Sequence, residues 1–115
     1  MSDIKRLTDL IVKFRDERDW QQFHNPKDEA ISLALEAAEV LEHFQWKTKE
    51  EIDAYIRTNK EDISDELADV MYWVLLMSHD LRIDLVEAFE KKLAKSAEKY
   101  PIEKAKGSHK KYNQL

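Results

Sequence analysis

Two segments of the chain each carry a pair of acidic residues three positions apart within an otherwise apolar stretch. The first pair is Glu36 and Glu39 in "LEAAEVLEHFQW", and the second is Glu66 and Asp69 in "DELADVMYW". Residues three apart lie on the same face of an α-helix, so each pair would present two carboxylates side by side. Four carboxylates facing one another would form a set of hard oxygen ligands suited to Mg²⁺ or Mn²⁺.

A simpler interpretation is that each acidic strip is the solvated face of an amphipathic helix. Three features favour a ligand site instead. The apolar arc of each helix is wider than the roughly 100° that a surface helix needs. The central parts of the strips contain no Lys or Arg for pairing along the helix, and Trp73 continues the second strip. The spacing alone leaves both interpretations open, although the absence of Glu-x-x-His on either helix argues against a di-iron site.

Hydrophobic spacing and capping signals predict an all-α fold that positions these acids, with four main helices and one short helix. Asn25, Thr48 and Asp84 are typical N-cap residues, and the last two are each followed three positions later by Glu. The segment "TNKED" is expected to separate the short helix from the next main one. The main helices are expected at about residues 2–19, 26 to 44 or 46, 61–79 and 84–99, and the short helix at about 48–57.

The composition of the 115-residue chain indicates one small helical domain, expected at residues 1–101, followed by a basic tail at 102–115 that could be partly disordered. One Gly and two Pro are too few for a turn-rich β fold. The net charge of −5 argues against a nucleic-acid polymer as partner, and the absence of Cys excludes disulfides. No apolar run approaches about 18 residues, so we expect a soluble, cytoplasmic protein with no membrane partner.

The ordered pattern Glu36-x-x-Glu39 and Glu66-x-x-Asp69 resembles the signature of the MazG-like, all-α nucleotide pyrophosphohydrolases. Two further segments share the resemblance, "RDERDWQQFHNPKD" before the first acidic helix and "KYP" after the last helix. The chain is most similar to the small dCTP pyrophosphatase-like members. The resemblance implies a bundle completed by oligomerisation, as a homodimer or homotetramer. It also implies Mg²⁺-dependent hydrolysis of a dNTP, such as dCTP or a modified nucleotide, to dNMP and pyrophosphate in nucleotide-pool house-cleaning.

The resemblance also assigns roles to individual residues. It makes Glu36, Glu39, Glu66 and Asp69 the catalytic metal ligands, although Glu39 is also a candidate for orienting the attacking water. Two departures stand out: Ser96 replaces an Asn that relatives often have, and Ile11 replaces a His that some dCTP-preferring relatives have. The candidate substrate-binding residues are Trp20, His24, Trp46, Trp73, Lys92, Ser96, Lys99 and Tyr100.

Two other functions remain open at the level of sequence. One is a non-catalytic helical oligomer that binds a nucleotide or a protein partner, with the acidic site as a remnant. The other is phosphoribosyl-ATP hydrolysis within the same superfamily, which fits the Trp-rich segments less well. Release of pyrophosphate from a nucleoside triphosphate would separate the catalytic from the non-catalytic interpretation.

Overall fold

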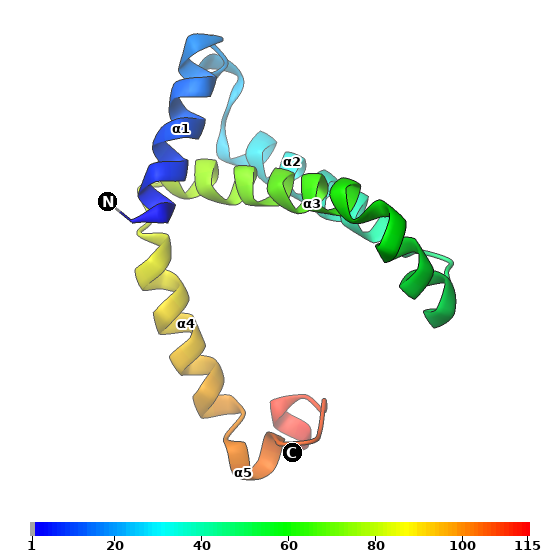
Figure 1. Cartoon of the computed structure of the whole chain (residues 1–115). Helices are drawn as coiled ribbons and strands as arrows, with labels where there is room; N and C mark the ends of the chain where they lie inside the picture. The colour runs from blue at the N-terminus through cyan, green and yellow to red at the C-terminus, as the bar shows by residue number, and fades with distance from the viewer. Residues whose placement is uncertain (1) are drawn as a thin grey trace. The chain divides into compact units, whose positions relative to one another are not determined.

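The computed structural model describes residues 2–115, and within that range it contains helices and no β-strand (Figure 1). The predicted all-α fold with four main helices is therefore confirmed. Backbone contacts divide the chain into two compact units, one ending at Arg82 and one spanning Ile83–Leu115. The helices are α1 (Asp3–Glu17), α2 (Pro26–Glu42), α3 (Lys49–Asp80), α4 (Leu85–Lys99) and α5 (Ile102–Ala105), with 3₁₀ turns η1 (Gln21–Phe23) and η2 (Tyr112–Gln114).

Each main helix begins at a side chain that caps its first turn, as the sequence predicts. Asn25 Oδ1 accepts a hydrogen bond from the backbone N–H of Asp28 at 3.0 Å, and Pro26 occupies the first turn of α2. Thr48 and Glu51 form a reciprocal capping box at the start of α3, with both hydrogen bonds at 3.2 Å. Capping of this kind fixes where α2 and α3 start, and so fixes the register of their acidic pairs.

The predicted break at "TNKED" is a kink and not a gap between helices, because α3 continues from Lys49 to Asp80. Asn59 alone has non-helical backbone angles, with φ −123° and ψ 20°. Its side-chain Nδ2 donates to the carbonyl of Tyr55 at 3.1 Å, which is the usual way that Asn competes with helical hydrogen bonding. The segment contains no Gly or Pro, so the helix bends there without ending.

The end of α2 also differs from the sequence prediction, because the helix stops at Glu42 and leaves Trp46 in the following loop. The loop is fastened to α3 through Tyr55. His43 Nδ1 hydrogen-bonds to the Tyr55 hydroxyl, and Lys47 Nζ lies 4.4 Å from the centre of the Tyr55 ring. Trp46 itself has a positive φ of 70°, an unfavourable value for a bulky side chain.

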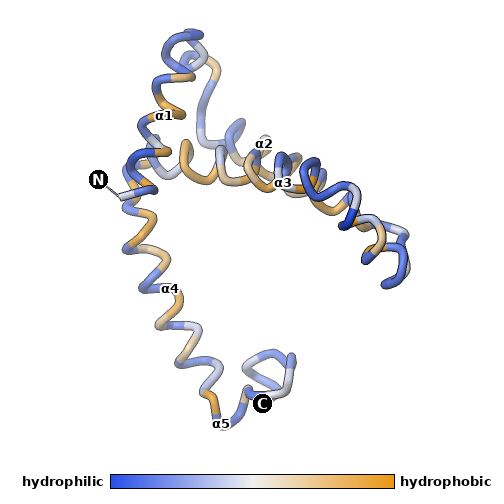
Figure 2. Tube along the Cα trace, viewed as in Figure 1, coloured by the Kyte–Doolittle hydropathy of each residue, from blue (hydrophilic) through white to orange (hydrophobic). Residues whose placement is uncertain are grey.

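In the first unit, α2 and α3 run side by side and α1 packs against α3 (Figure 1). Figure 2, which is coloured by the hydropathy of each residue, shows apolar residues along both α2 and α3. Leu75 and Leu76 of α3 are buried in the core. Two charged residues, Arg15 and Glu29, are as buried as these leucines. The core of this unit is therefore small and partly polar, and its helices keep much apolar surface exposed.

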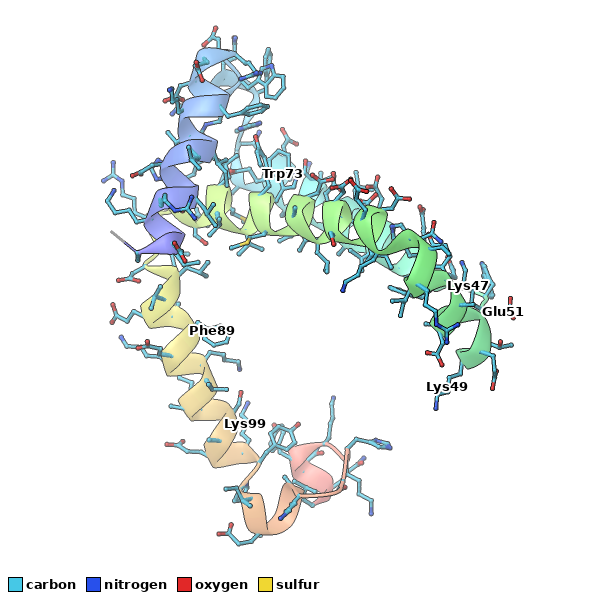
Figure 3. All side chains as sticks on the ribbon, viewed as in Figure 1. Lys47, Lys49, Glu51, Trp73, Phe89 and Lys99 are labelled. Carbon is cyan, nitrogen blue, oxygen red and sulfur yellow. The ribbon has the colours of Figure 1, made fainter. Side chains whose placement is uncertain are left out.

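The second unit consists of α4 and the tail that follows it. The tail is not featureless, since it includes α5 and η2, and Tyr112 packs edge-on against Tyr100 with ring centres 6.2 Å apart. Lys99 Nζ lies 4.9 Å from the Tyr112 ring. Phe89 projects from α4 and is 65% exposed (Figure 3). Within residues 2–115, no helix combines the length and apolar character needed to cross a membrane.

Candidate active site

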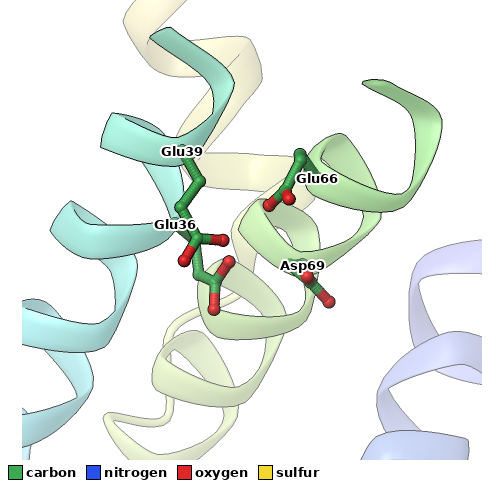
Figure 4. A group of neighbouring side chains, drawn as sticks. All are labelled: Glu36, Glu39, Glu66 and Asp69. Atoms are coloured by element: carbon green, nitrogen blue, oxygen red, sulfur yellow. The ribbon is translucent and has the colours of Figure 1, made fainter. Parts of the chain in front are cut away.

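The four acids singled out by their spacing converge between α2 and α3. Glu36 and Glu39 project from α2 toward Glu66 and Asp69 on α3 (Figure 4). One carboxylate oxygen from each of the four lies within 4.8 Å of those of the other three. The convergence follows from the fold, because the side-by-side packing of α2 and α3 turns two separate helical strips into one cluster, which we call the acidic cluster.

The acidic cluster carries uncompensated negative charge. Glu36 Oε2 and Glu66 Oε2 are shielded from solvent, and neither accepts a hydrogen bond within residues 2–115. Burial and the neighbouring carboxylate of Glu39 raise the pKa of Glu36. The neighbouring carboxylate of Glu39, burial and the charges of the other acids raise the pKa of Glu66 to about 7. These shifts are the expected result of holding like charges together with no cation to neutralise them.

The donor set of the acidic cluster fits a hard divalent cation. All four candidate ligands are carboxylates, which Mg²⁺ and Mn²⁺ prefer and which soft metals do not. The two shielded oxygens that lack a partner are the atoms such an ion would satisfy. Glu39 and Asp69 are exposed, so a substrate can reach the cluster from their side.

An apolar cavity of about 500 Å³ opens beside the acidic cluster, between α1 and α3. Its size is within the range usual for small-molecule sites. Trp20 and Phe14 form part of its wall as an edge-to-face pair, with ring centres 5.7 Å apart. Asp69 belongs both to the cavity wall and to the acidic cluster, so the two share a border. The lining residues are Leu10, Ile11, Phe14, Trp20, Asp69, Tyr72 and Trp73.

His24 lies next to this cavity through its contact with Trp73. The two rings pack edge-on, with centres 5.4 Å apart. His24 Nδ1 is buried without a hydrogen-bond partner. Burial, and then the positive charge of Arg15, lower the pKa of His24, which favours a neutral ring. Among the predicted substrate-binding residues, the structure thus gathers Trp20, His24 and Trp73 in one place, with Trp73 on the side of α3 that faces α1 (Figure 3).

The other predicted substrate-binding residues lie elsewhere. Trp46 is 92% exposed in the loop after α2 and does not line the cavity of its own chain. Four residues belong to the second unit, where Ser96 is half-buried and the other three are exposed. Their roles in substrate binding therefore stay predictions, and they are Lys92, Ser96, Lys99 and Tyr100.

Sequence reasoning did not assign three of the remaining cavity residues, Leu10, Phe14 and Tyr72, to a site. Leu10 and Phe14 read as the apolar face of a first helix, and their four-residue spacing is as typical of a core as of a pocket wall. Tyr72 stands directly before Trp73 and one helical turn after the metal-ligand candidates. This position in the sequence was the signal that could have assigned Tyr72 to the site. Its pKa is raised by burial, consistent with a hydroxyl facing a largely apolar cavity.

Comparison with known proteins places this arrangement in context. The chain is 33% identical to dCTP pyrophosphatase 1 of Bos taurus over 117 aligned positions, covering 100% of the chain and 68% of that protein. It is equally 33% identical to dCTP pyrophosphatase 1 of Homo sapiens, covering 67% of it. The crystal structure of a pyrophosphatase from Archaeoglobus fulgidus superposes with a TM-score of 0.82 at 34% identity, covering 88% of this chain and 94% of that one.

These relatives agree with a match to a family profile that spans most of the chain. Residues 31–115 match the MazG-like family, a segment that includes all four acids of the acidic cluster and the loop carrying Trp46. The identity to the mammalian proteins extends over the rest of the chain, so that α1 and η1 are included. The chain belongs to the MazG-like family.

Proposed function

We propose that this protein is a Mg²⁺-dependent nucleoside triphosphate pyrophosphohydrolase that converts a dNTP to dNMP and pyrophosphate. The substrate class is dCTP or a related or modified deoxynucleotide, as the names of the mammalian relatives suggest. The observation that carries the proposal is the acidic cluster, in which four carboxylates lie within 4.8 Å of one another.

The shared position of Asp69 supports the assignment of a nucleotide as substrate. A nucleotide has a planar aromatic base at one end and a polyanionic chain at the other. The cavity beside Trp20 and Trp73 offers aromatic faces to a base, and the acidic cluster offers ligands to a phosphate-bound cation. Because Asp69 borders both, one nucleotide can occupy the cavity and reach the cluster.

The role proposed for each acid of the acidic cluster follows from how exposed that acid is. Glu36, Glu66 and Asp69 would hold the cation, the first two through oxygens that are shielded from solvent. Mg²⁺ bound here would neutralise charge on the phosphate oxygens and lower the pKa of water. Glu39 is exposed and stands within the same cluster, so it can accept a hydrogen bond from the water that attacks the α-phosphorus.

We also propose that the active protein is a homodimer or homotetramer. Trp46 is 92% exposed, Leu67 is 55% exposed and Phe89 is 65% exposed, which is more apolar surface than a small monomer usually leaves to water. The positive φ of Trp46 adds a second reason, since a strained and fully exposed Trp is more easily understood if a second copy covers it.

A product analysis tests the proposal. The purified protein is incubated with Mg²⁺ and each common NTP and dNTP, and the products are separated by chromatography. The proposal expects the nucleoside monophosphate and pyrophosphate in equal amounts, with a deoxycytidine nucleotide among the best substrates. Release of orthophosphate and a nucleoside diphosphate, or no turnover of any nucleotide with either Mg²⁺ or Mn²⁺, would overturn it.

A further inference from the structure

A second group of charged residues lies buried among the three helices of the first unit, away from the acidic cluster. Arg15 of α1 and Glu29 of α2 are each 1% exposed. Arg15 Nη1 donates to Asp80 Oδ2 of α3 at 2.7 Å. We call these three residues the Arg15 cluster. It joins all three helices of the unit, and neither the metal ligands nor the cavity wall includes any of its members.

The Arg15 cluster contains two acids and one base, so a proton on one of the acids would make the cluster electrically neutral. The carboxylate oxygens of Glu29 find no donor within the described part of the chain. Burial and the adjacent Asp80 raise the pKa of Glu29 to about 7, and in its neutral form Glu29 can donate to Asp80. Asp80 is then held from two sides, by Arg15 and by Glu29, and its pKa is lowered accordingly against the effect of burial.

The backbone of Arg15 connects this cluster to Trp20. The N–H of Trp20 donates to the Arg15 carbonyl at 3.1 Å, and the N–H of Asp19 donates to Asp16 at 3.1 Å. Asp19 has a φ of 54°, so α1 ends in a Schellman motif with Asp19 in the left-handed position. Where Arg15 is held, the turn that carries Trp20 into the cavity wall is held with it.

His24 lies at the other end of the segment that begins with Trp20. The N–H of Phe23 donates to the Trp20 carbonyl and the N–H of His24 donates to the Gln21 carbonyl, both at 3.0 Å. The His24 ring packs edge-on against Trp73. The segment from Trp20 to His24 is therefore joined to Arg15 at the Trp20 end and packs against Trp73 at the His24 end.

We propose that Arg15 and Asp80 are positioning residues for base binding: their ion pair holds Trp20 in the wall of the cavity and His24 beside it. This inference rests on the proposed function, because it takes the cavity to be the site of the base. The ion pair does not touch the substrate or the metal, and it acts only through the two aromatic side chains.

The experiment compares Asp80→Asn with two matched variants, measuring kcat, KM and the affinity for Mn²⁺ at a temperature well below the melting point. Asp80→Asn keeps the shape of the side chain and removes the charge that holds Arg15. Glu29→Gln keeps a neutral donor beside Asp80, so it should retain the wild-type KM. Asp9→Asn breaks the exposed ion pair between Lys5 and Asp9 on α1, the helix that carries Arg15, and serves as a surface control.

The expected result is that Asp80→Asn raises KM about tenfold, within the range caused by losing one base stack. Its kcat should stay within about twofold and its Mn²⁺ affinity should be unchanged, because an interaction made equally in the bound and transition states acts on binding alone. Glu29→Gln and Asp9→Asn should keep the wild-type KM. A merely structural role would lower the amount of active protein without moving KM.

Two outcomes would overturn the positioning role: a folded Asp80→Asn protein with the wild-type KM, or one that loses kcat and Mn²⁺ affinity as well. If Asp80→Asn does not fold, Arg15→Lys, which keeps the charge but not the fork of donors, is judged by the same values. Failure of the proposed function looks different, since the wild-type protein itself would then neither hydrolyse nor bind a dNTP.

Discussion

Helices α2 and α3 carry two groups of carboxylates that differ in how their charge is balanced. At the acidic cluster, Glu36, Glu39, Glu66 and Asp69 lie together with no basic side chain among them. At the Arg15 cluster, Arg15 pairs with Asp80, and the pKa of the neighbouring Glu29 is raised to about 7 by burial and by Asp80. Glu29 lies seven positions before Glu36 on α2, and Asp80 eleven positions after Asp69 on α3, so both clusters use the same pair of helices.

The difference indicates which cluster needs a neutralising group from outside the chain. Buried or half-buried carboxylates are unstable unless something neutralises them. The Arg15 cluster contains its own cation, the Arg15 guanidinium, which pairs with Asp80. The acidic cluster contains only acids, and a divalent cation is the simplest group that would neutralise it. The four predictions that follow test this contrast, in order of decreasing effect.

The largest effect is expected from removing a ligand in the acidic cluster. Asp69→Asn should lower kcat at least roughly 100-fold, since even residues that only support metal ligands contribute up to that factor. The melting temperature without metal should stay the same or rise, because one repelling charge is lost. Steady-state kinetics and thermal melting measure the two quantities. Turnover near the wild-type rate at limiting Mg²⁺ would remove Asp69 from the site.

Breaking the Arg15 cluster should instead affect stability first. Arg15→Met leaves Asp80 without its partner and should lower the free energy of unfolding by about 3 kcal/mol, the low end of the usual range because Asp80 is partly exposed. Adding Asp80→Leu should recover part of this loss, since the remaining Glu29 can stay neutral. Denaturant titration measures both variants.

An exposed ion pair on the same helix provides the control for that comparison. Arg6→Met breaks the contact with Asp3, which is 3.5 Å long and lies at the surface. Its effect should be below about 0.5 kcal/mol. Equal losses for Arg6→Met and Arg15→Met would show that the buried pair does not hold the three helices together.

Trp20→Ala should act on substrate binding, with a loss of about 1–3 kcal/mol in kcat/KM that appears mainly in KM. Stacking on a base is the same before and during the reaction, so kcat should change little. Phe23→Ala, at a neighbouring residue that is 63% exposed, is the matched control. A Trp20→Ala protein that melts much earlier but keeps its KM would identify Trp20 as a packing residue.

The smallest effect concerns pH. The pKa of Glu29 is raised from its ordinary value of 4.5 to about 7 in the folded chain. Folding therefore favours the protonated form, and the stability it contributes is complete below pH 4.5 and is lost as the pH rises through 7. Glu29→Gln is neutral throughout, so its stability relative to wild type should rise from pH 5 to pH 8 by on the order of 1 kcal/mol. Parallel stability curves for the two proteins would contradict this.

The sequence was sufficient to predict the acidic cluster as one candidate site because its signal is local. Each acidic pair lies within one helical turn, and the caps at Asn25 and Thr48 define where the two helices begin. The resemblance to a family then favoured a metal site over a solvated face. The kink at Asn59 was predicted as a full break, because sequence shows a weak helix former but not whether neighbouring turns can bridge it.

The Arg15 cluster could not be predicted, since its members come from three helices and its meaning depends on how those helices pack. Arg15 reads in sequence as one more charge in "RDERDW", and Glu29 as a favourable acid in the first turn of α2. Only the packing of α1 and α2 against α3 buries both of them. The end of α2 was predicted at Phe44 or Trp46, a few residues late, because no obvious stop residue follows Glu42.

The central claim is that the acidic cluster binds a divalent cation from outside the chain. Calorimetric titration of Mn²⁺ into the metal-free protein, repeated with Glu36→Gln, tests it most directly. We predict saturable binding of at least one ion per chain, an increase in melting temperature on binding, and loss of both in the Glu36→Gln variant. Unchanged binding in Glu36→Gln, or no binding and no increase in melting temperature in the wild-type protein, would contradict the claim.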